Sequence, residues 1–311
     1  MLQQLLWLLY GLILGYTIIK ILLDTHSTPK TLGYLLMVLI LPGIGILLYF
    51  SFGINYRHHK SMSIGMRSQL EEDQRFQKEV RNNTKKLLSS EGTSIGHFDL
   101  LVHFLAEIGG EHLSQNKFKL LVNGEEKFPE VLKTLEDARK FIHMEYYDWE
   151  NDIRGNQIKE MLLKKIKDGV KVRILYDDYA SRKIKRNIIR ELKIGGAEVF
   201  PKIKVKLVQM ANRINHRDHR KIIIVDGIIG FVGGINLSDR YDNSIDTGLY
   251  WRDTHVKFTG SLTKSLQRHF IASWNASAAI KLPFQMELFP DAPYEHSEGI
   301  NALGQVVAGG P

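Results

Sequence analysis

The side chains with the most evident chemistry lie in one stretch, INHRDHRKIIIVDGIIGFVGGIN, residues 214–236. His219 and Lys221 are two residues apart, so an extended strand through both would display them on one face. Asn236 follows Gly233-Gly234, which let the backbone approach a ligand closely, and it offers amide donors to an oxyanion. A neutral imidazole can attack phosphorus while the cation and the amide hold the nonbridging oxygens. The stretch therefore indicates phosphoryl chemistry with His219 as the nucleophile.

Two short strands joined by a tight turn must position these residues. The runs RKIIIV, 220–225, and IIGFV, 228–232, are dense in β-branched residues, and Asp226-Gly227 between them is a strong hairpin signal. Asp226 lies an odd number of residues from His219, so it does not share the face of the histidine. We expect a turn or scaffold role for Asp226. The alternative is that its carboxylate touches the substrate, so it is also a catalytic candidate.

The strands belong to a longer region, residues 116–290, in which short apolar runs alternate with amphipathic segments. This β-α-β-α-β succession predicts a layered α/β/α domain with a mixed, largely parallel sheet. Strands are expected at 117–122, 141–149, 170–176 and 197–200, and helices are expected to open at Pro129 and to cover 157–168 and 184–192.

The N-terminus carries two apolar stretches, Leu5 to Leu23 and Leu32 to Phe52. Each is about as long as the roughly 20 residues that cross a hydrocarbon core. We expect residues 1–53 to form a two-helix transmembrane hairpin, with Pro42 kinking the second span. Basic residues follow the second span, whereas the loop between the spans has one lysine, which predicts that the bulk of the chain is cytoplasmic. These flanking basic residues are Arg57, Lys60 and Arg67.

Charge and cysteine content narrow the class of partner. The formal net charge is +8 and the pI is about 9.4, which favours nucleic acid or an acidic lipid surface, and the two spans count against nucleic acid. The chain has no cysteine and no cluster with metal-ligand spacing, so we expect no disulfide, metal or cofactor. Residues 54–115 are expected to form a charged helical linker that is solvated or lies on anionic headgroups.

The pattern from the histidine to the asparagine resembles the signature of the phospholipase D superfamily, H-x-K-x4-D-x6-G-[GS]-x-N. Every position is met, by His219, Lys221, Asp226, Gly233, Gly234 and Asn236. Within that superfamily the chain is similar to bacterial cardiolipin synthases in LILPGIGILLYFSFG, NKFKLLVNGEEKF, IHMEYYDW, DGVKVRILYDD and YWRDTHVKFTG. The resemblance implies a multi-pass protein of the bacterial inner membrane in which His219 is the nucleophile and Lys221 and Asn236 hold phosphate. It also implies that Asp253, in WRDTH, orients the histidine.

The reaction implied by the resemblance is transfer of a phosphatidyl group between two phosphatidylglycerols, giving cardiolipin and glycerol. In an in-line displacement one imidazole cannot both attack phosphorus and protonate the group that leaves on the opposite side. Family members have two copies of the motif for this purpose, and this chain has one. We expect residues 291–311 to be the start of a truncated second half. A symmetric homodimer that brings two His219 residues together is the alternative.

Two other functions stay open at this point. A membrane-anchored phosphodiesterase working as a homodimer would use water as the acceptor and would be a phospholipase or a nuclease. A catalytically silent half would serve as a binding module. The alternative for Asp253 is an ion pair with Arg252 or another neighbour. Structural roles are expected for the other candidates: a scaffold contact for Glu145, and surface, packing or membrane-flank positions for His216, His255, His143, His58 and His59.

Overall fold

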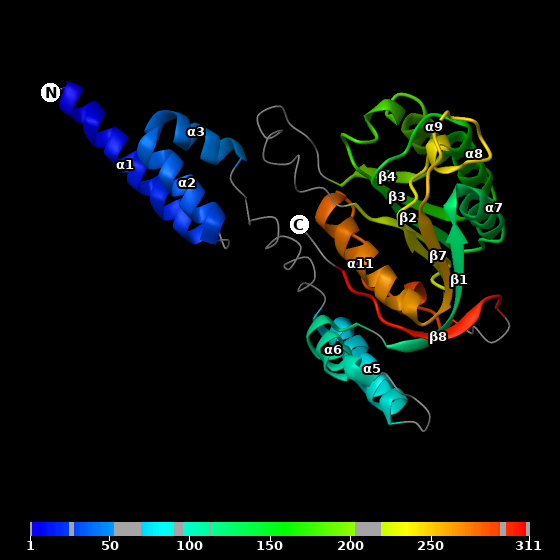
Figure 1. Cartoon of the computed structure of the whole chain (residues 1–311). Coiled ribbons are helices and arrows are strands. Elements are labelled where there is room, and N and C mark those ends of the chain that lie inside the picture. Colours follow the sequence, from blue (N-terminus) through cyan, green and yellow to red (C-terminus); the bar gives the residue numbers. More distant parts are fainter. Residues whose placement is uncertain are drawn as a thin grey trace. The chain divides into compact units, whose positions relative to one another are not determined.

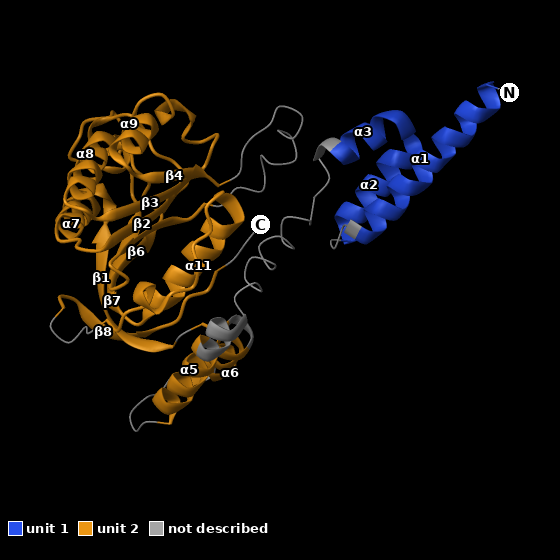
Figure 2. Cartoon of the chain, turned by 180° about the vertical axis from the view of Figure 1, so that it is seen from behind, with its two compact units in different colours: residues 1–63, 205–217, 311 blue, residues 64–204, 218–310 orange. Residues whose placement is uncertain are grey.

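The computed structural model describes residues 2–24, 28–52, 70–89, 96–111, 113–202, 219–292 and 297–308. The expectations for Arg57, His58, His59, Lys60, Arg67 and His216 fall outside these ranges. The chain divides into two compact units, one of residues 1–63, 205–217 and 311 and one of residues 64–204 and 218–310 (Figure 2). The candidate site residues all lie in the second unit.

The first unit contains three apolar helices, α1 (Leu2–Asp24), α2 (Thr28–Ile40) and α3 (Pro42–Phe52). By length and composition, α1 is the one described helix that is long and apolar enough to cross a membrane. The second stretch forms two shorter helices instead of one kinked span, because Pro42 has no N–H to continue the helix and begins a new one. Gly45 then packs against α2, where an added Cβ would lie 2.7 Å from Val38 Cα.

The second unit is built on one eight-stranded sheet of order β4-β3-β2-β5-β6-β7-β1-β8 (Figure 1). The strands are β1 (Ser114–Val122), β2 (Phe141–Tyr146), β3 (Lys171–Tyr176), β4 (Glu198–Pro201), β5 (Lys221–Val225), β6 (Ile229–Gly233), β7 (Thr254–Gly260) and β8 (Ile300–Gly304). The sheet is mixed, as predicted, but only β2–β3 and β3–β4 pair in parallel. The expectation of a largely parallel sheet is wrong, because β5, β6, β7 and β1 follow one another as antiparallel neighbours.

Helices cover both faces of the sheet and give the expected α/β/α layers (Figure 1). One face packs against α7 (Asn123–Glu136), α8 (Ile153–Lys167) and α9 (Ile188–Gly195), and the other against α11 (Leu262–Ser277). The remaining helical segments are α5 (Leu70–Leu88), α6 (Asp99–Phe104), η1 (Gly96–Phe98), η2 (Leu105–Gly109), η3 (Arg182–Ile184), η5 (Asp239–Tyr241) and η6 (Met286–Leu288).

Local sequence signals account for most of the positions at which helices and strands begin and end. Asp226 and Gly227 both adopt positive φ, at 55° and 72°, and Ile228 N donates to Val225 O at 3.0 Å, so the predicted hairpin turn is confirmed. Helix α8 begins after Asp152, whose side chain caps Gly155 N at 2.9 Å. Helix α7 begins at Asn123, earlier than the expected start at Pro129.

The helix α5 has one buried face. Phe76 and Val80 lie in the same apolar core as α11, and the Phe76 ring contacts Phe284 and Phe289 with centroids 5.7 and 5.5 Å apart. Lys264 of α11 lies 3.6 Å from Glu79. The helix was expected to be solvated or to lie on anionic headgroups. Its N-terminal half instead packs in the core of the sheet unit, while its C-terminal half keeps exposed basic residues.

Candidate active site

The strand directions bring the ends of several elements to one edge of the sheet, which we call the site edge. It receives the C-terminal ends of β1, β2, β3, β4 and β6 and the N-terminal ends of β5 and β7. The register pairs Lys221 with Tyr146 and Gly233 with His255. The motif residues before β5 and after β6 are therefore neighbours in space.

His219 and Lys221 lie together at the start of β5. The strand itself begins at Lys221, but the Lys221 ammonium is 3.1 Å from His219 Nδ1, so the two side chains do share a face. Lys221 Nζ also donates to the His219 carbonyl at 2.7 Å. The imidazole packs on the ring of Tyr147 with centroids 3.8 Å apart, and the Lys221 ammonium lies 5.2 Å from the centroid of the same ring. His219 is exposed and Lys221 is buried, which leaves the imidazole accessible to substrate.

Gly233, the last residue of β6, and Gly234, which follows it, lie where no side chain fits. A Cβ on Gly233 would lie 2.5 Å from His255 Nδ1 and 2.6 Å from Thr254 O. A Cβ on Gly234 would overlap the Asp253 carboxylate. The glycines therefore allow the loop to lie directly on the start of β7, as well as permitting close approach to a ligand.

Asn236 is held in one orientation by hydrogen bonds at both ends of its amide. Its Oδ1 accepts from Asp148 N at 3.2 Å, and its Nδ2 donates to the Tyr241 hydroxyl at 2.6 Å. The second N–H of the amide has no partner among the described residues. Because an Nδ2 group has two hydrogens, Asn236 can keep both contacts and still donate to a phosphate oxygen.

A buried lysine, Lys127, binds the backbone of the loop Gly233–Asn236. Lys127 of α7 has no exposed surface, and its ammonium donates to the carbonyls of Ile235 and Asn236 at 3.2 and 3.1 Å. Burial lowers the pKa of Lys127 well below its usual value; the charge of Asp253 opposes this shift and that of Lys221 adds to it. The sequence carries no signal for Lys127, because the charge pattern of its helix is that of an ordinary surface helix.

His255 lies beside the same loop in the interior of the sheet. It has no exposed surface, and neither ring nitrogen has a hydrogen-bond partner among the described residues. Burial lowers its pKa well below the usual range, and Lys127 and Lys221 lower it further, so the ring is neutral. A packing role was expected for His255, and its burial beneath Gly233 agrees with that.

Asp226 lies at the other end of β5 from the site. Its carboxylate accepts from three consecutive backbone N–H groups, those of Arg139, Lys140 and Phe141, at 2.8, 2.7 and 2.8 Å. This contact joins the β5–β6 turn to the turn that precedes β2. These contacts support the turn or scaffold role expected for Asp226, and its role as a catalytic residue stays a prediction.

Asp253 is at the site edge, immediately before β7. Its carboxylate packs on Gly234 and accepts from Thr254 N at 2.7 Å, and its backbone N–H donates to Asn123 Oδ1 at 3.0 Å. The Arg252 guanidinium donates to the backbone carbonyl of Asp253, at 2.7 Å, rather than forming the ion pair considered as an alternative. These contacts fix the position of the carboxylate next to the loop Gly233–Asn236.

Two other candidates have structural partners on the α11 side. Glu145 forms a buried ion pair with Lys202. His143 is stacked on Phe270 with ring centroids 4.5 Å apart, and burial lowers its pKa to about 3. Both agree with the scaffold and packing roles expected from the sequence.

Several residues of the site were missed in the sequence. Tyr147, Asp148 and Tyr241 contact His219 or Asn236 although they lie outside the motif. Burial and the nearby Glu150 raise the pKa of Asp148, even though Arg240 forms an ion pair with it. Tyr147 and Asp148 lie in the loop directly after β2, where functional side chains are common, although a strand was expected to run through them. Tyr241 lies in η5 and had no local sequence signal.

The site therefore combines an exposed imidazole, a buried ammonium and an oriented amide on a glycine-rich loop, which suits attack on a phosphate ester. The comparison with family models agrees: residues 131–274 match the model described as the phospholipase D-like domain of cardiolipin synthase. This part of the chain is a phospholipase D-like domain.

The domain is of the cardiolipin synthase type, and the resemblance to bacterial cardiolipin synthases is confirmed. The chain is 35% identical over 296 residues to the cardiolipin synthase of Alkalihalophilus pseudofirmus, covering 94% of this chain and 57% of that protein. It is 29% identical to the major cardiolipin synthase ClsA of Bacillus subtilis, covering 94% and 61%. The chain thus spans little more than half the length of these relatives. Among solved structures, Nuc of Salmonella typhimurium, a phospholipase D family member, aligns with TM-score 0.42 and 17% identity, covering 54% of this chain and 99% of Nuc.

Proposed function

We propose that the chain is the motif-bearing half of a membrane-anchored phosphatidyltransferase that makes cardiolipin and glycerol from two phosphatidylglycerols. The observation that carries the proposal is the meeting of His219, Lys221 and Asn236 at one edge of the sheet. The ammonium lies 3.1 Å from the imidazole, and the amide is oriented by two hydrogen bonds. The names of the relatives supply the class of lipid substrate.

In the first step a ring nitrogen of His219 attacks the phosphorus of phosphatidylglycerol. A P–N bond forms, the P–O bond to the glycerol headgroup breaks, and the departing oxygen takes a proton from an acid on the opposite side. In the second step the headgroup hydroxyl of another phosphatidylglycerol attacks the phosphohistidine. Its proton passes to the group that donated the first one, the P–N bond breaks, and cardiolipin leaves with His219 restored.

Each supporting side chain has a defined part in these steps. Lys221 and the remaining N–H of Asn236 stabilise the nonbridging oxygens as charge shifts toward them. Gly233 and Gly234 let the phosphate lie against the loop. Asp253 orients the imidazole and stabilises its charged form, as a carboxylate does for a nucleophilic or basic histidine.

The acid on the opposite side must come from outside this motif. A second H-x-K-x4-D motif supplies it, carried either by a complementing half or by another copy of this chain in a two-fold dimer.

The N-terminal helices anchor the enzyme where its substrate lies. We propose that α1 crosses the bacterial inner membrane, that α2 and α3 return the chain, and that the second unit is cytoplasmic. The apolar length of α1 and the basic residues after α3 support this orientation.

The test is to reconstitute the chain in vesicles that contain phosphatidylglycerol labelled with ³²P, alone and with a second motif-bearing half. Acid-stable and acid-labile protein phosphate are separated, and the lipid products are resolved. We expect an acid-labile adduct on His219 and labelled cardiolipin. His219→Asn abolishes both, whereas His103→Asn, at an exposed position on α6, leaves both unchanged.

The products separate this function from its alternatives. Phosphatidic acid in place of cardiolipin would identify a phosphodiesterase that uses water as the acceptor. The absence of any adduct in the presence of a second motif would identify a silent binding module. Either result would remove the transferase proposal.

A further inference from the structure

The loop that connects the two sides of the site carries an exposed apolar tip. Residues 243–252, which we call the rim loop, leave the phosphate-binding region after Asn236 and return to it at Asp253. At the tip, Leu249 is 70% exposed and Tyr250 is 74% exposed. Trp251, which follows them, is 38% exposed. Exposed large apolar side chains that adjoin one another mark a surface that binds a partner.

The base of the rim loop is rigidly attached to the site. The Asn243 side chain donates to Trp251 O at 2.9 Å and accepts from Trp251 N at 2.7 Å, which closes the loop. The Trp251 ring contacts Tyr241 with centroids 5.1 Å apart, and the Tyr241 hydroxyl accepts from Asn236. A continuous chain of contacts therefore joins the phosphate-binding amide to the exposed tip.

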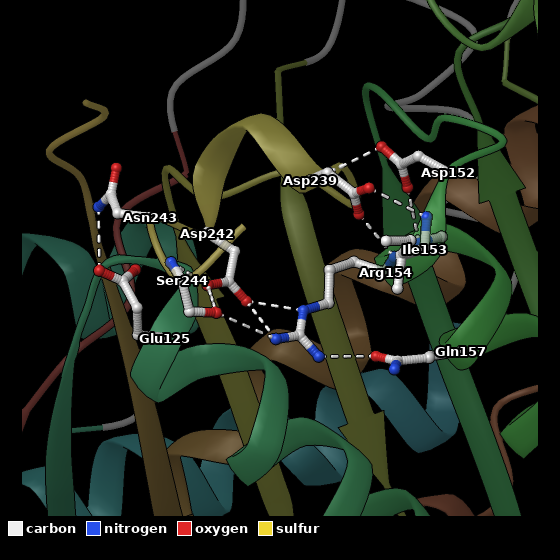
Figure 3. A network of polar contacts seen from close by, with 10 residues as sticks. Glu125, Asp152, Ile153, Arg154, Gln157, Asp239, Asp242, Asn243 and Ser244 are labelled. Carbon is white, nitrogen blue, oxygen red and sulfur yellow. Dashed lines mark hydrogen bonds and ion pairs between the residues drawn. The ribbon is translucent and has the colours of Figure 1, made fainter. Parts of the chain in front are cut away.

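A polar network secures the segment just before the loop to α7 and α8 (Figure 3). Arg154 binds the Asp242 carboxylate at 2.6 Å, and Asp242 also accepts from the Ser244 hydroxyl at 2.5 Å. Asn243 reaches Glu125 of α7 at 3.0 Å. With its base fixed in this way, the loop holds its apolar tip in solvent instead of folding it onto the protein.

Basic residues lie on the same edge of the sheet, in the segment that follows β3. Arg182, Lys183 and Arg186 are exposed there, and Arg252 is exposed at the end of the rim loop. The rim loop itself contains one acidic residue, Asp246, which is exposed. The exposed basic residues of this edge therefore outnumber the acidic residue of the rim loop. The edge thus combines apolar side chains with a basic border, which complements an anionic lipid surface.

We propose that the rim loop docks the site onto an anionic bilayer, with Leu249 and Tyr250 below the headgroups and the basic residues among the lipid phosphates. Tyr and Trp are the aromatic residues that favour the membrane interface, because each has an apolar body and a polar atom. Docking would place the phosphate group of a lipid beside His219 without removing its acyl chains from the membrane. The inference rests on the proposed function, since it concerns how a lipid phosphate reaches that site.

The absence of cysteine in the chain allows a direct test. A nitroxide label is attached to Tyr250→Cys in the full chain, which is reconstituted in vesicles of equal parts phosphatidylglycerol and phosphatidylcholine. The matched control is Ile194→Cys, since Ile194 is 75% exposed and lies at the end of α9 toward the opposite edge of the sheet. Leu249→Cys provides a second position in case the label at 250 perturbs the loop.

Collision with oxygen and with a water-soluble nickel complex then reports the depth of each label. We expect greater relaxation by oxygen than by nickel at 249 and 250, and the reverse at 194. Greater relaxation by nickel than by oxygen at all three positions would overturn the proposal. Labels at 249 and 250 that are shielded from both reagents and show dipolar broadening would also overturn it, because a second copy of the chain would then cover the loop. The measurement needs no turnover, so its failure is separable from failure to form the His219 adduct.

Discussion

Replacing Asp226 tests whether the last residue of the H-x-K-x4-D pattern acts on stability or on chemistry. Its carboxylate lies at the opposite end of β5 from His219 and accepts three backbone N–H groups at 2.7–2.8 Å. Asp226→Ala removes all three acceptor contacts and leaves alanine at a φ of 55°. We expect this variant to unfold more easily and to keep its chemistry per folded molecule.

The magnitude follows from the surroundings of each donor. The partly buried N–H of Phe141 would lose its partner, which costs about 2 kcal/mol. The N–H groups of Arg139 and Lys140 are exposed, so water replaces the carboxylate and the loss is about 1 kcal/mol for the pair. Alanine in the left-handed region costs about 1 kcal/mol more than aspartate. Asp226→Ala should therefore lose about 4 kcal/mol. Asp226→Asn, which keeps an acceptor oxygen and tolerates this φ, should lose about 1 to 2 kcal/mol.

The assay is urea unfolding of the full chain in micelles, followed by the fluorescence of Trp149 and Trp274, which are fully buried in the second unit. With a denaturant slope of about 2 kcal/mol per molar urea, the alanine variant should shift the midpoint down by about 2 M. The control is Asp246→Asn, an exposed turn aspartate that accepts from Gly248 N at 3.0 Å, which should change the free energy of unfolding by less than about 0.5 kcal/mol.

The opposite combination of results would contradict a purely structural role for Asp226. If Asp226→Asn unfolds at the same urea concentration as the parent chain but forms no phosphohistidine, the carboxylate has a catalytic part that the hydrogen bonds do not reveal. Adduct formation has to be expressed per folded molecule, because a less stable variant loses adduct in proportion to its unfolded fraction.

Three further predictions follow from the site and the core. Gly234→Ala should lower the rate of adduct formation by more than about 10-fold, because its Cβ displaces the Asp253 carboxylate, and single-turnover kinetics would measure this. Lys127→Met should lower the same rate by releasing the carbonyl of Asn236, with a loss of about 1 to 2 kcal/mol in stability, because two buried carbonyls lose their donor while the cost of burying an ammonium is relieved. His143 takes up a proton in the unfolded chain below pH 6.5 but in the folded chain only near pH 3, so stability falls as the pH drops through this window, by about 2 kcal/mol at pH 5. His143→Gln should remove that loss in urea unfolding at pH 7 and pH 5.

Each of these has an outcome that contradicts it. Gly195→Ala is the control for the glycine variant, because the Cβ there meets only the flexible end of Leu163; equal rates in both alanine variants would show that the overlap at Gly234 relaxes. An unchanged rate in Lys127→Met would mean that the loop holds its shape without the ammonium. If His143→Gln loses as much stability between pH 7 and pH 5 as the parent chain, groups other than His143 cause that loss.

Neighbouring residues in the chain specify the local chemistry and most of the local structure. The spacing of His219 and Lys221 placed their side chains together, and the Asp226-Gly227 pair predicted the hairpin turn that the backbone adopts. These signals are local, because they depend on strand periodicity and on the few residues that tolerate positive φ. The apolar length of α1 is likewise a property of consecutive residues.

The direction of the strands and the surroundings of the site depend on long-range packing. Antiparallel pairing of β5, β6 and β7 brings Asp253 against Gly234 and aligns Gly233 with His255, and no sequence pattern specifies those partners. The burial of Lys127 beneath the Asn236 carbonyl depends in the same way on where α7 packs. Long-range pairing of this kind is set by the fit of whole surfaces to one another, which the types of neighbouring residues in the chain do not encode.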